Sequence, residues 1–223
     1  NAGVKVRTIK TTLETEWEAS YEQINNAINE NTKMIVANYP NNPTGKMFGK
    51  MFDKIINTAK EHDLYVLSDE IYEEYDRREA EVPPSCWDVM QYEKTIITKS
   101  FSKSHAMTGY RIGYVIAEPS IIEKMSKLQA LSLTNVSEPI QYVALQALEA
   151  DVSGNTEIIN SRLEALIKIA KDIGLEFIEP DGAMYLFAKT KYKNFDATKF
   201  SEKLLEHGVA IAPGEGFGDY KEF

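Results

Sequence analysis

The stretch KTIITKSFSKSHAMTGYRIGYVIA, residues 94–117, holds two apolar runs separated by a polar loop. The first run, 94–98, is short, rich in β-branched residues and without alternation, as is typical of strands buried on both faces. The loop is too short and too polar for a crossover helix, because a parallel connection usually needs about a dozen residues or more. We therefore predict that the second run, 110–117, forms a strand antiparallel to the first.

Two similar apolar runs lie upstream, at residues 32–37 and 64–68. Helical patterns precede and separate them, at residues 20–28, where Ser20 starts a capping-box spacing, and at residues 50–62, which carry an apolar face. Alternation of strand, helix and strand is typical of parallel sheets. The sequence thus predicts an α/β fold, with a mostly parallel sheet and helices on both faces.

The second half of the chain is mainly helical in pattern. The predicted helices cover residues 120–131, 139–150 and 155–174. A polar break at 151–155 precedes the last of them and marks a predicted boundary between a large domain, 1–150, and a partial α+β small domain, 151–223. The expected elements of the small domain after its first helix are strands at 175–180, 183–188 and 209–213 and a helix at 197–208.

The two ends of the sequence lead us to expect a fragment. The chain opens on Asn1 without a methionine and runs into VKVRTI, residues 4–9, which reads as a strand. The small domain breaks off at Phe223. If these residues were the whole polypeptide, we would expect them to fold around the sheet but to be inactive.

Composition narrows the class of protein. Lys and Arg number 25 against 34 Asp and Glu, a net charge of −9, and no basic cluster of the kind that binds nucleic acid is present. The apolar runs fall well short of the roughly 20 residues that span a membrane. The single cysteine, Cys86, fits a reducing compartment, and the histidines show no metal-ligand spacing. We expect a soluble cytoplasmic protein that binds neither nucleic acid, membrane nor metal.

Polar motifs follow each of the three predicted parallel strands: NYPNNPTG, SDEIYEEY and KSFSKSH. Each has an ordinary structural explanation, as a turn, a capped strand end or an exposed loop lysine. In open parallel sheets, however, ligands bind outside the carboxyl ends of the strands. Three different strands therefore bring Asn42, Asp69 and Lys103 to one edge, and this combination favours a binding site.

Five stretches carry a resemblance to a known family: PNNPTG, SDEIY, SFSKSHAMTGYRIGY and, more loosely, SEPIQYVALQAL and VAIAPGEGFG. In their order and spacing they resemble the fold-type I pyridoxal-phosphate enzymes, and among these the class I and II aminotransferases of the aspartate-aminotransferase type. The resemblance implies an incomplete large domain of that fold and pyridoxal 5′-phosphate as cofactor.

By this resemblance the catalytic residues are Lys103, Asp69 and Tyr72. Lys103 would form a Schiff base with the cofactor aldehyde and then shuttle a proton. Lys99 is the alternative Schiff-base lysine, but it lacks an arginine at the matching distance. Asp69 would keep the pyridine nitrogen protonated. Tyr72 and Asn42 would hydrogen-bond the ring oxygen. Arg111, Ser100 and Ser102 would hold the phosphate, to which a guanidinium fork is well suited.

The same resemblance implies amino-acid and 2-oxo-acid substrates and a homodimer in the full-length enzyme. The family's glycine-rich phosphate turn, its aromatic ring that stacks on the cofactor and its arginine for the substrate carboxylate have no counterpart in this sequence. Three functions stay open: an amino-acid aminotransferase, a β-lyase of the same fold, and a catalytically incompetent cofactor-binding fragment. Which amino acid serves as donor also stays open.

Overall fold

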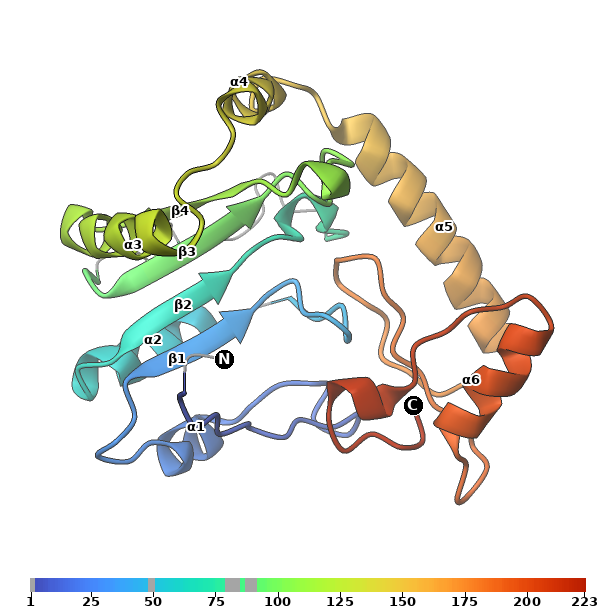
Figure 1. The fold of residues 1–223 in the computed structure, drawn as a ribbon. Helices are drawn as coiled ribbons and strands as arrows, with labels where there is room; N and C mark the ends of the chain where they lie inside the picture. Colours follow the sequence, from blue (N-terminus) through green and yellow to red (C-terminus); the bar gives the residue numbers. More distant parts are fainter. Residues whose placement is uncertain (1–2, 48–50, 79–84, 87–91) are drawn as a thin grey trace.

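A four-stranded sheet with the order β1-β2-β3-β4 forms the centre of the molecule in the computed structural model, which describes residues 3–47, 51–78, 85–86 and 92–223 (Figure 1). Its strands are β1 (Met34–Asn38), β2 (Tyr65–Asp69), β3 (Thr95–Ser100) and β4 (Gly113–Ala117). The first three are parallel and β4 is antiparallel to β3. The predicted strand positions and the predicted direction of β4 are confirmed.

The pairing of β3 with β4 depends on a glycine. Gly113 lies opposite Ser100 in the antiparallel register. A Cβ atom at position 113 would lie 2.5 Å from the carbonyl oxygen of Lys99, closer than any real side chain packs. The glycine therefore lets the strand return immediately after the loop and keeps that loop at the sheet edge.

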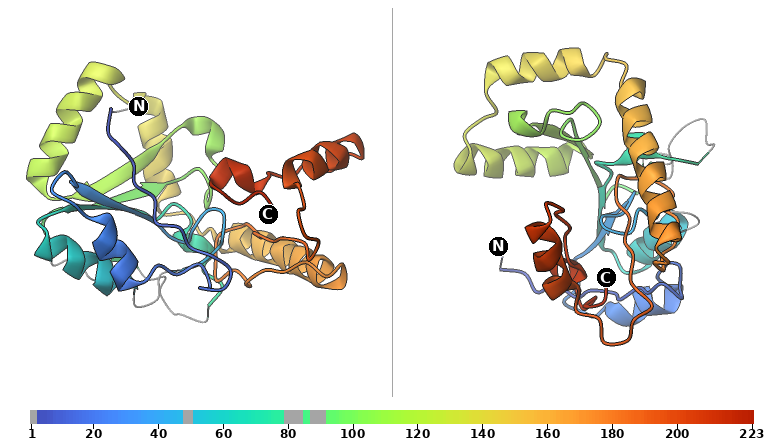
Figure 2. Two further views of the ribbon diagram at one scale, coloured as in Figure 1. Left: turned by 90° about the horizontal axis from the view of Figure 1, so that it is seen from below. Right: turned by 90° about the vertical axis from the view of Figure 1, so that its right-hand side faces the viewer.

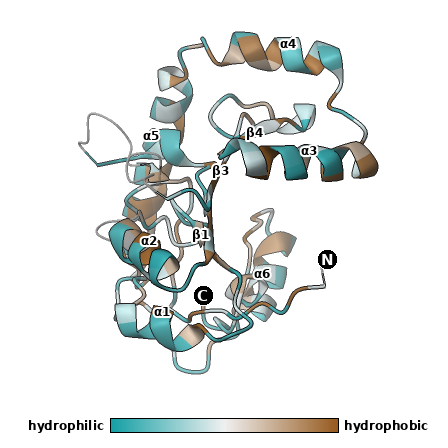
Figure 3. Ribbon diagram, turned by 90° about the vertical axis from the view of Figure 1, so that its left-hand side faces the viewer, coloured by the Kyte–Doolittle hydropathy of each residue, from teal (hydrophilic) through white to brown (hydrophobic). Residues whose placement is uncertain are grey.

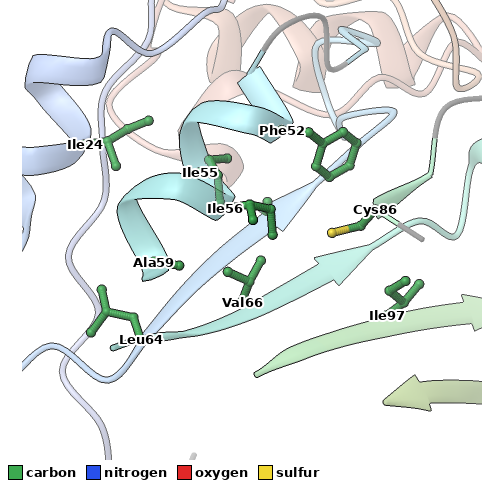
Figure 4. Close-up of a cluster of buried hydrophobic side chains, with 10 residues drawn as sticks. Ile24, Phe52, Ile55, Ile56, Ala59, Leu64, Val66, Cys86 and Ile97 are labelled. Carbon is green, nitrogen blue, oxygen red and sulfur yellow. The ribbon is translucent and has the colours of Figure 1, made fainter. Parts of the chain in front are cut away.

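One face of the sheet packs against α2 (Met51–Glu61) and α1 (Tyr21–Ala27). Ser20 caps α1 and forms the predicted capping box with Gln23. Ten buried residues make the core between the helices and the sheet (Figure 4): Ile24, Ala37, Phe52, Ile55, Ile56, Ala59, Leu64, Val66, Cys86 and Ile97. The apolar face predicted for residues 50–62 thus forms the main hydrophobic core.

Helix α3 (Pro119–Ser132) lies on the opposite side of the sheet from α2 (Figures 2 and 3). Helices on both faces are therefore confirmed. The cover is incomplete, because on β1 the side chains of Met34 and Val36 are 39% and 64% exposed. The prediction that the parallel strands are buried on both faces is wrong for β1, since α3 covers the β4 end of the sheet.

The described residues form further α-helices after α3, and short 3₁₀ turns before and after them. They are α4 (Glu138–Ala147), α5 (Ser153–Asp172), α6 (Ala197–Glu206) and the short 3₁₀ turns η1 (Glu73–Tyr75), η3 (Thr108–Tyr110) and η4 (Gly214–Phe217). Helix α5 begins at Ser153, inside the predicted polar break, and Gly174 follows its end with a φ of +75°. The boundary between domains 1–150 and 151–223 stays a prediction.

Four predicted strands do not form within the described residues. Of the two at 175–180 and 183–188, only the bridge between Glu176 and Lys189 remains, and residues 209–213 and 4–9 have no strand partner. Val4 and Val6 are 71% and 81% exposed. An apolar run becomes a strand only when a neighbouring backbone satisfies its hydrogen bonds along its length, and beyond that single bridge no described backbone forms a ladder with these segments.

Candidate functional site

The loops that follow β1, β2 and β3 leave the sheet at the same edge (Figure 1). Asn38, the last residue of β1, ties two of these loops together. Its side-chain nitrogen donates to the carbonyl oxygen of Asp69 at 3.2 Å, and its side-chain oxygen accepts from the Asn42 backbone N–H at 2.9 Å. The structure therefore places Asn42 beside the end of β2, as the sequence predicted.

Asp69 ends β2 with its carboxylate half-buried. The Thr98 hydroxyl on β3 donates to Asp69 Oδ1 at 3.2 Å. Burial raises the pKa of Asp69, and hydrogen bonds from Thr98 and the Ile71 backbone oppose that increase. Among the described residues, no cation forms a salt bridge with this carboxylate.

Tyr72 lies in the turn after β2, just before η1, and is only 3% exposed. Its hydroxyl oxygen lies 2.6 Å from that of Tyr185. Burial raises the pKa of the Tyr72 phenol, the Tyr185 hydroxyl adds to the increase, and the Asn42 side chain lowers it. Asn42, Tyr72 and Tyr185 thus form one polar group, in which Asn42 Oδ1 is buried without a hydrogen-bond partner in the described chain.

Lys103 Nζ lies 6.0 Å from the centre of the Tyr72 ring. The backbone of Lys103 is fixed, because its carbonyl oxygen accepts from the Tyr75 hydroxyl at 2.8 Å and from the Ala106 N–H at 3.0 Å. Its half-buried ammonium group forms no ion pair with any described residue. Lys103 is therefore an available amine held on a rigid backbone next to Tyr72.

Lys99 has a different environment. Its ammonium group lies 2.9 Å from Glu70 and also contacts Glu73. Burial opposes its charge, but the hydrogen bonds with Glu73 and Glu70 outweigh burial and raise the pKa of Lys99. Both carboxylates occupy this lysine, so of the two candidate lysines only Lys103 is free to react.

Ser100 ends β3, and Ser102 and Arg111 lie in the loop between β3 and β4. The Ser102 N–H donates to Ser100 Oγ at 3.1 Å, and the Thr108 hydroxyl donates to the Ser102 carbonyl at 2.9 Å. Arg111 is exposed, with a left-handed φ of 55°, and its guanidinium donates to the Thr108 carbonyl at 3.0 Å. The structure therefore brings the three predicted phosphate-binding residues together.

Four residues of this site escaped the sequence analysis: Tyr185, Glu70, Asn38 and Thr98. Asn38 and Thr98 are polar residues at the carboxyl ends of apolar strands, which is a signal that could have found them. Glu70 lies inside the motif SDEIY but was not singled out. Tyr185 comes from a run that was predicted as a strand, and its position at the site depends on long-range contacts.

Metal-binding groups and membrane-spanning helices are both absent from the described residues. No group of three or more His, Cys, Asp and Glu side chains in that part of the chain could hold a metal ion. None of the helices described is long and apolar enough to span a membrane.

Comparison with known proteins identifies the family. The profile described as Aminotransferase class I and II matches residues 1–222. An aspartate aminotransferase of Thermotoga maritima is 34% identical over 97% of this chain and 57% of its own length. An asparagine–oxo-acid transaminase of Streptococcus mutans is 36% identical over 98% of this chain and 58% of its own length.

Solved structures agree. The aspartate aminotransferase of Thermotoga maritima superposes with a TM-score of 0.90 at 32% identity, covering 97% of this chain and 57% of that one. An aromatic aminotransferase of Pyrococcus horikoshii gives a TM-score of 0.87 at 33% identity, covering 96% and 59%. The chain belongs to the class I and II aminotransferase family, and it spans 57% of the length of the Thermotoga relative. The predicted fold class is confirmed.

Proposed function

We propose that the protein is an aminotransferase that uses pyridoxal 5′-phosphate to move an amino group between an amino acid and a 2-oxo acid. One observation carries the proposal: Lys103, Tyr72 and Asp69 meet at the carboxyl edge of the sheet in a chain of this family. The relatives are named for aspartate, asparagine and aromatic amino acids, which supports an amino-acid substrate and leaves the donor open.

The residues at this edge fit the cofactor. Within the described chain the Asp69 carboxylate and the Lys103 ammonium have no ion pair. Pyridoxal phosphate offers a basic ring nitrogen to a carboxylate, an aldehyde to an amine, and a polar ring oxygen to Asn42 and Tyr72. Each group that lacks a partner therefore has a chemical counterpart on the cofactor.

When bound, the cofactor supplies an aldehyde and a ring that withdraws electron density from the α-carbon of an amino acid. Asp69 lies half-buried at the end of β2, and burial makes its charge costly unless a cation pairs with it. A carboxylate in this position holds a proton on the ring nitrogen. The Tyr72 hydroxyl and the Asn42 amide nitrogen would donate hydrogen bonds to the ring oxygen of the cofactor.

Lys103 would be the amine that binds the aldehyde and would then move a proton at the substrate α-carbon. Its side chain has the freedom to do both, because it forms no salt bridge with a described residue, while its carbonyl is bonded to Tyr75 and Ala106. General acid–base catalysis by a positioned group of this kind contributes about 10²–10⁴-fold. Ser100, Ser102 and Arg111 hold the phosphate at the loop.

We also infer that the protein forms a homodimer and is cytoplasmic. Helices α3 and α4 expose several large apolar side chains, of which Leu131 is 86%, Tyr142 63% and Leu145 56% exposed. Several large exposed apolar side chains on two successive helices support an interface there. The single cysteine, Cys86, is buried and free, which suits a reducing compartment.

Borohydride trapping tests the proposed function. The protein is saturated with pyridoxal phosphate, reduced with borohydride, digested and mapped by mass spectrometry. We expect the pyridoxyl label on Lys103. The exposed Lys124 in α3 serves as the internal control for labelling of surface lysines. A stoichiometric label on Lys99 instead of Lys103, or, in the full-length enzyme, no transfer of amino groups from any amino acid to 2-oxoglutarate, would overturn the proposal.

A further inference from the structure

The segment PDGAMY, residues 180–185, reaches the candidate site from the C-terminal part of the chain (Figure 1). Asp181 joins it to both neighbouring loops. Its carboxylate accepts from the Met47 N–H at 3.2 Å and pairs with Lys46 at 3.3 Å, while its carbonyl accepts from the Arg77 N–H at 2.8 Å. The segment is thus bonded to the loops that carry Asn42 and Tyr72.

The packing around this segment leaves no spare room. A Cβ atom at Gly45 would lie 2.3 Å from Pro180 Cβ, and one at Gly182 would lie 2.9 Å from the Tyr75 carbonyl oxygen. Ala183 is fully buried with Tyr72 and Tyr75 in a small core cluster. The segment that carries Tyr185 is therefore packed against both the loop after β1 and the loop after β2.

Tyr185 meets Tyr72 edge to face, with ring centroids 5.4 Å apart at 81° and hydroxyl oxygens 2.6 Å apart. Only one hydrogen fits between two oxygens at that distance. Either Tyr72 donates to Tyr185, the arrangement in which this bond raises the pKa of Tyr72, or another acceptor takes the Tyr72 hydrogen and Tyr185 donates to Tyr72 in turn. Within the described chain the Tyr185 hydroxyl has no other hydrogen-bond partner.

We propose that Tyr185 is a positioning residue: its hydroxyl donates to Tyr72 and so aims the Tyr72 hydrogen at the ring oxygen of the cofactor. This inference rests on the proposed function. A chain of two hydrogen bonds is stronger than its separate members, because each polarises the next. The Tyr185 hydroxyl therefore stabilises negative charge on an oxygen that it does not itself touch.

Three titratable groups among the described residues surround the Tyr72 hydroxyl. The titratable groups that face its phenol are Asp69 from β2, Lys103 from the loop after β3, and Tyr185 from the segment 180–185. Asp69 and Lys103 have opposite charges and belong to the cofactor site itself. Tyr185 is the neutral member of this set, so removing its hydroxyl tests the hydrogen bond without changing the net charge.

The experiment compares Tyr185→Phe with the parent protein, both loaded with pyridoxal phosphate. We measure the pH at which the absorption spectrum of the bound cofactor changes. Loss of a donor that supports negative charge on the ring oxygen makes the cofactor hold its proton more tightly. We therefore expect this midpoint to rise by about 0.5–1 pH unit, which corresponds to one hydrogen bond.

Tyr92→Phe is the matched control, because the Tyr92 hydroxyl is also bonded in the interior, to the Leu64 carbonyl at 2.6 Å, but away from the site. It should leave the midpoint unchanged. Tyr72→Phe should raise the midpoint at least as much as Tyr185→Phe, and the double variant should add nothing further. Additive shifts would show that the two hydroxyls act separately.

Failure of this inference is distinguishable from failure of the proposed function. If borohydride labels Lys103 in Tyr185→Phe but the midpoint matches that of the parent or of Tyr92→Phe, Tyr185 has no positioning role. If Lys103 is not labelled in the parent protein, the function itself is wrong. Urea unfolding of each variant without cofactor verifies that the fold is intact before the spectra are compared.

Discussion

Asp69 and Glu70 are adjacent carboxylates with opposite surroundings. Glu70 is 2% exposed and accepts from Ser68 Oγ at 2.8 Å, Ser85 Oγ at 2.6 Å and the Cys86 N–H at 2.8 Å, besides pairing with Lys99. Asp69 is half-buried, and no described cation pairs with it. The charge of Glu70 is thus balanced by an ion pair and hydrogen bonds within the chain, whereas the charge of Asp69 has no ion-pair partner among the described residues.

The two lysines of β3 and its loop repeat this difference. Lys99 contacts Glu70 and Glu73, while Lys103 has no ion pair among the described residues. Paired buried charges fix the ends of β2 and β3 relative to each other, and the unpaired groups lie where a ligand can reach them. The charged groups of the candidate site, Asp69 and Lys103, thus lack ion-pair partners among the described residues. The neighbouring pair Glu70 and Lys99, which fixes the strand ends, is fully paired.

The largest effect is expected for Lys103→Ala. Because the amine is the proposed reacting group, turnover should fall by about 10⁴-fold or more, and the borohydride label should disappear. The fold should change little, within about 0.5 kcal/mol, because no described residue pairs with the ammonium. Steady-state kinetics and urea unfolding measure the two effects. Lys124→Ala is the control and should keep normal turnover. Near-normal turnover by Lys103→Ala would refute the role of Lys103.

The next largest effect is expected for Asp69→Asn. The amide keeps the size of the side chain and can still accept from Thr98, but it cannot hold a proton on the ring nitrogen. Removing one preorganised electrostatic group of this kind costs about 10²–10³-fold in turnover. The borohydride label on Lys103 should persist. Unchanged single-turnover kinetics would show that Asp69 has no such role.

Glu70→Gln provides the contrasting variant at the neighbouring position. Breaking a buried ion pair should lower the free energy of unfolding by about 3 kcal/mol, because Lys99 loses one of its two carboxylates. Urea unfolding without cofactor measures this loss. If Glu70→Gln is as stable as the parent protein, the Glu70–Lys99 pair does not hold the strand ends together.

The smallest effect is expected for the stability of Asp69→Asn without cofactor. Burial raises the pKa of Asp69 in the folded state, so its ionised form costs stability at neutral pH. The free energy of unfolding of the variant should equal or exceed that of the parent protein. The gain should be no more than about 0.5 kcal/mol, because the carboxyl group is partly solvated.

The pH dependence of this gain follows from the sign of the pKa shift. Below about pH 3.9, the ordinary pKa of aspartate, the carboxyl group is protonated in both the folded and unfolded states and the gain vanishes. It grows as the pH rises toward the folded pKa and is complete above it. Urea titrations of the variant and the parent protein at pH 4 and pH 7 measure it. A gain that is larger at pH 4 would contradict the assigned cause.

The sequence predicted those parts of the structure that depend on local chemistry. The β-branched runs became β1, β2 and β3, the Ser20–Gln23 spacing became a capping box, and the polar strand ends brought Asn42, Asp69 and Lys103 to one edge. The pairing of Glu70 with Lys99 and of Tyr72 with Tyr185 depends on distant contacts that no local pattern encodes. The strands predicted at 175–213 failed for the same reason, since strand formation needs a partner backbone.

The contact between Asp181 and Met47 has a consequence for the order in which the molecule is made. The two residues are separated by 134 positions in the chain. During synthesis, the strands and α2 are complete long before Asp181 leaves the ribosome, and contacts of high sequence separation form late because closing a long loop costs entropy. A nascent chain therefore acquires its sheet first and lacks the Tyr185 contact with Tyr72. The candidate site is complete only after the segment 180–185 has been synthesised and has packed against the loops after β1 and β2.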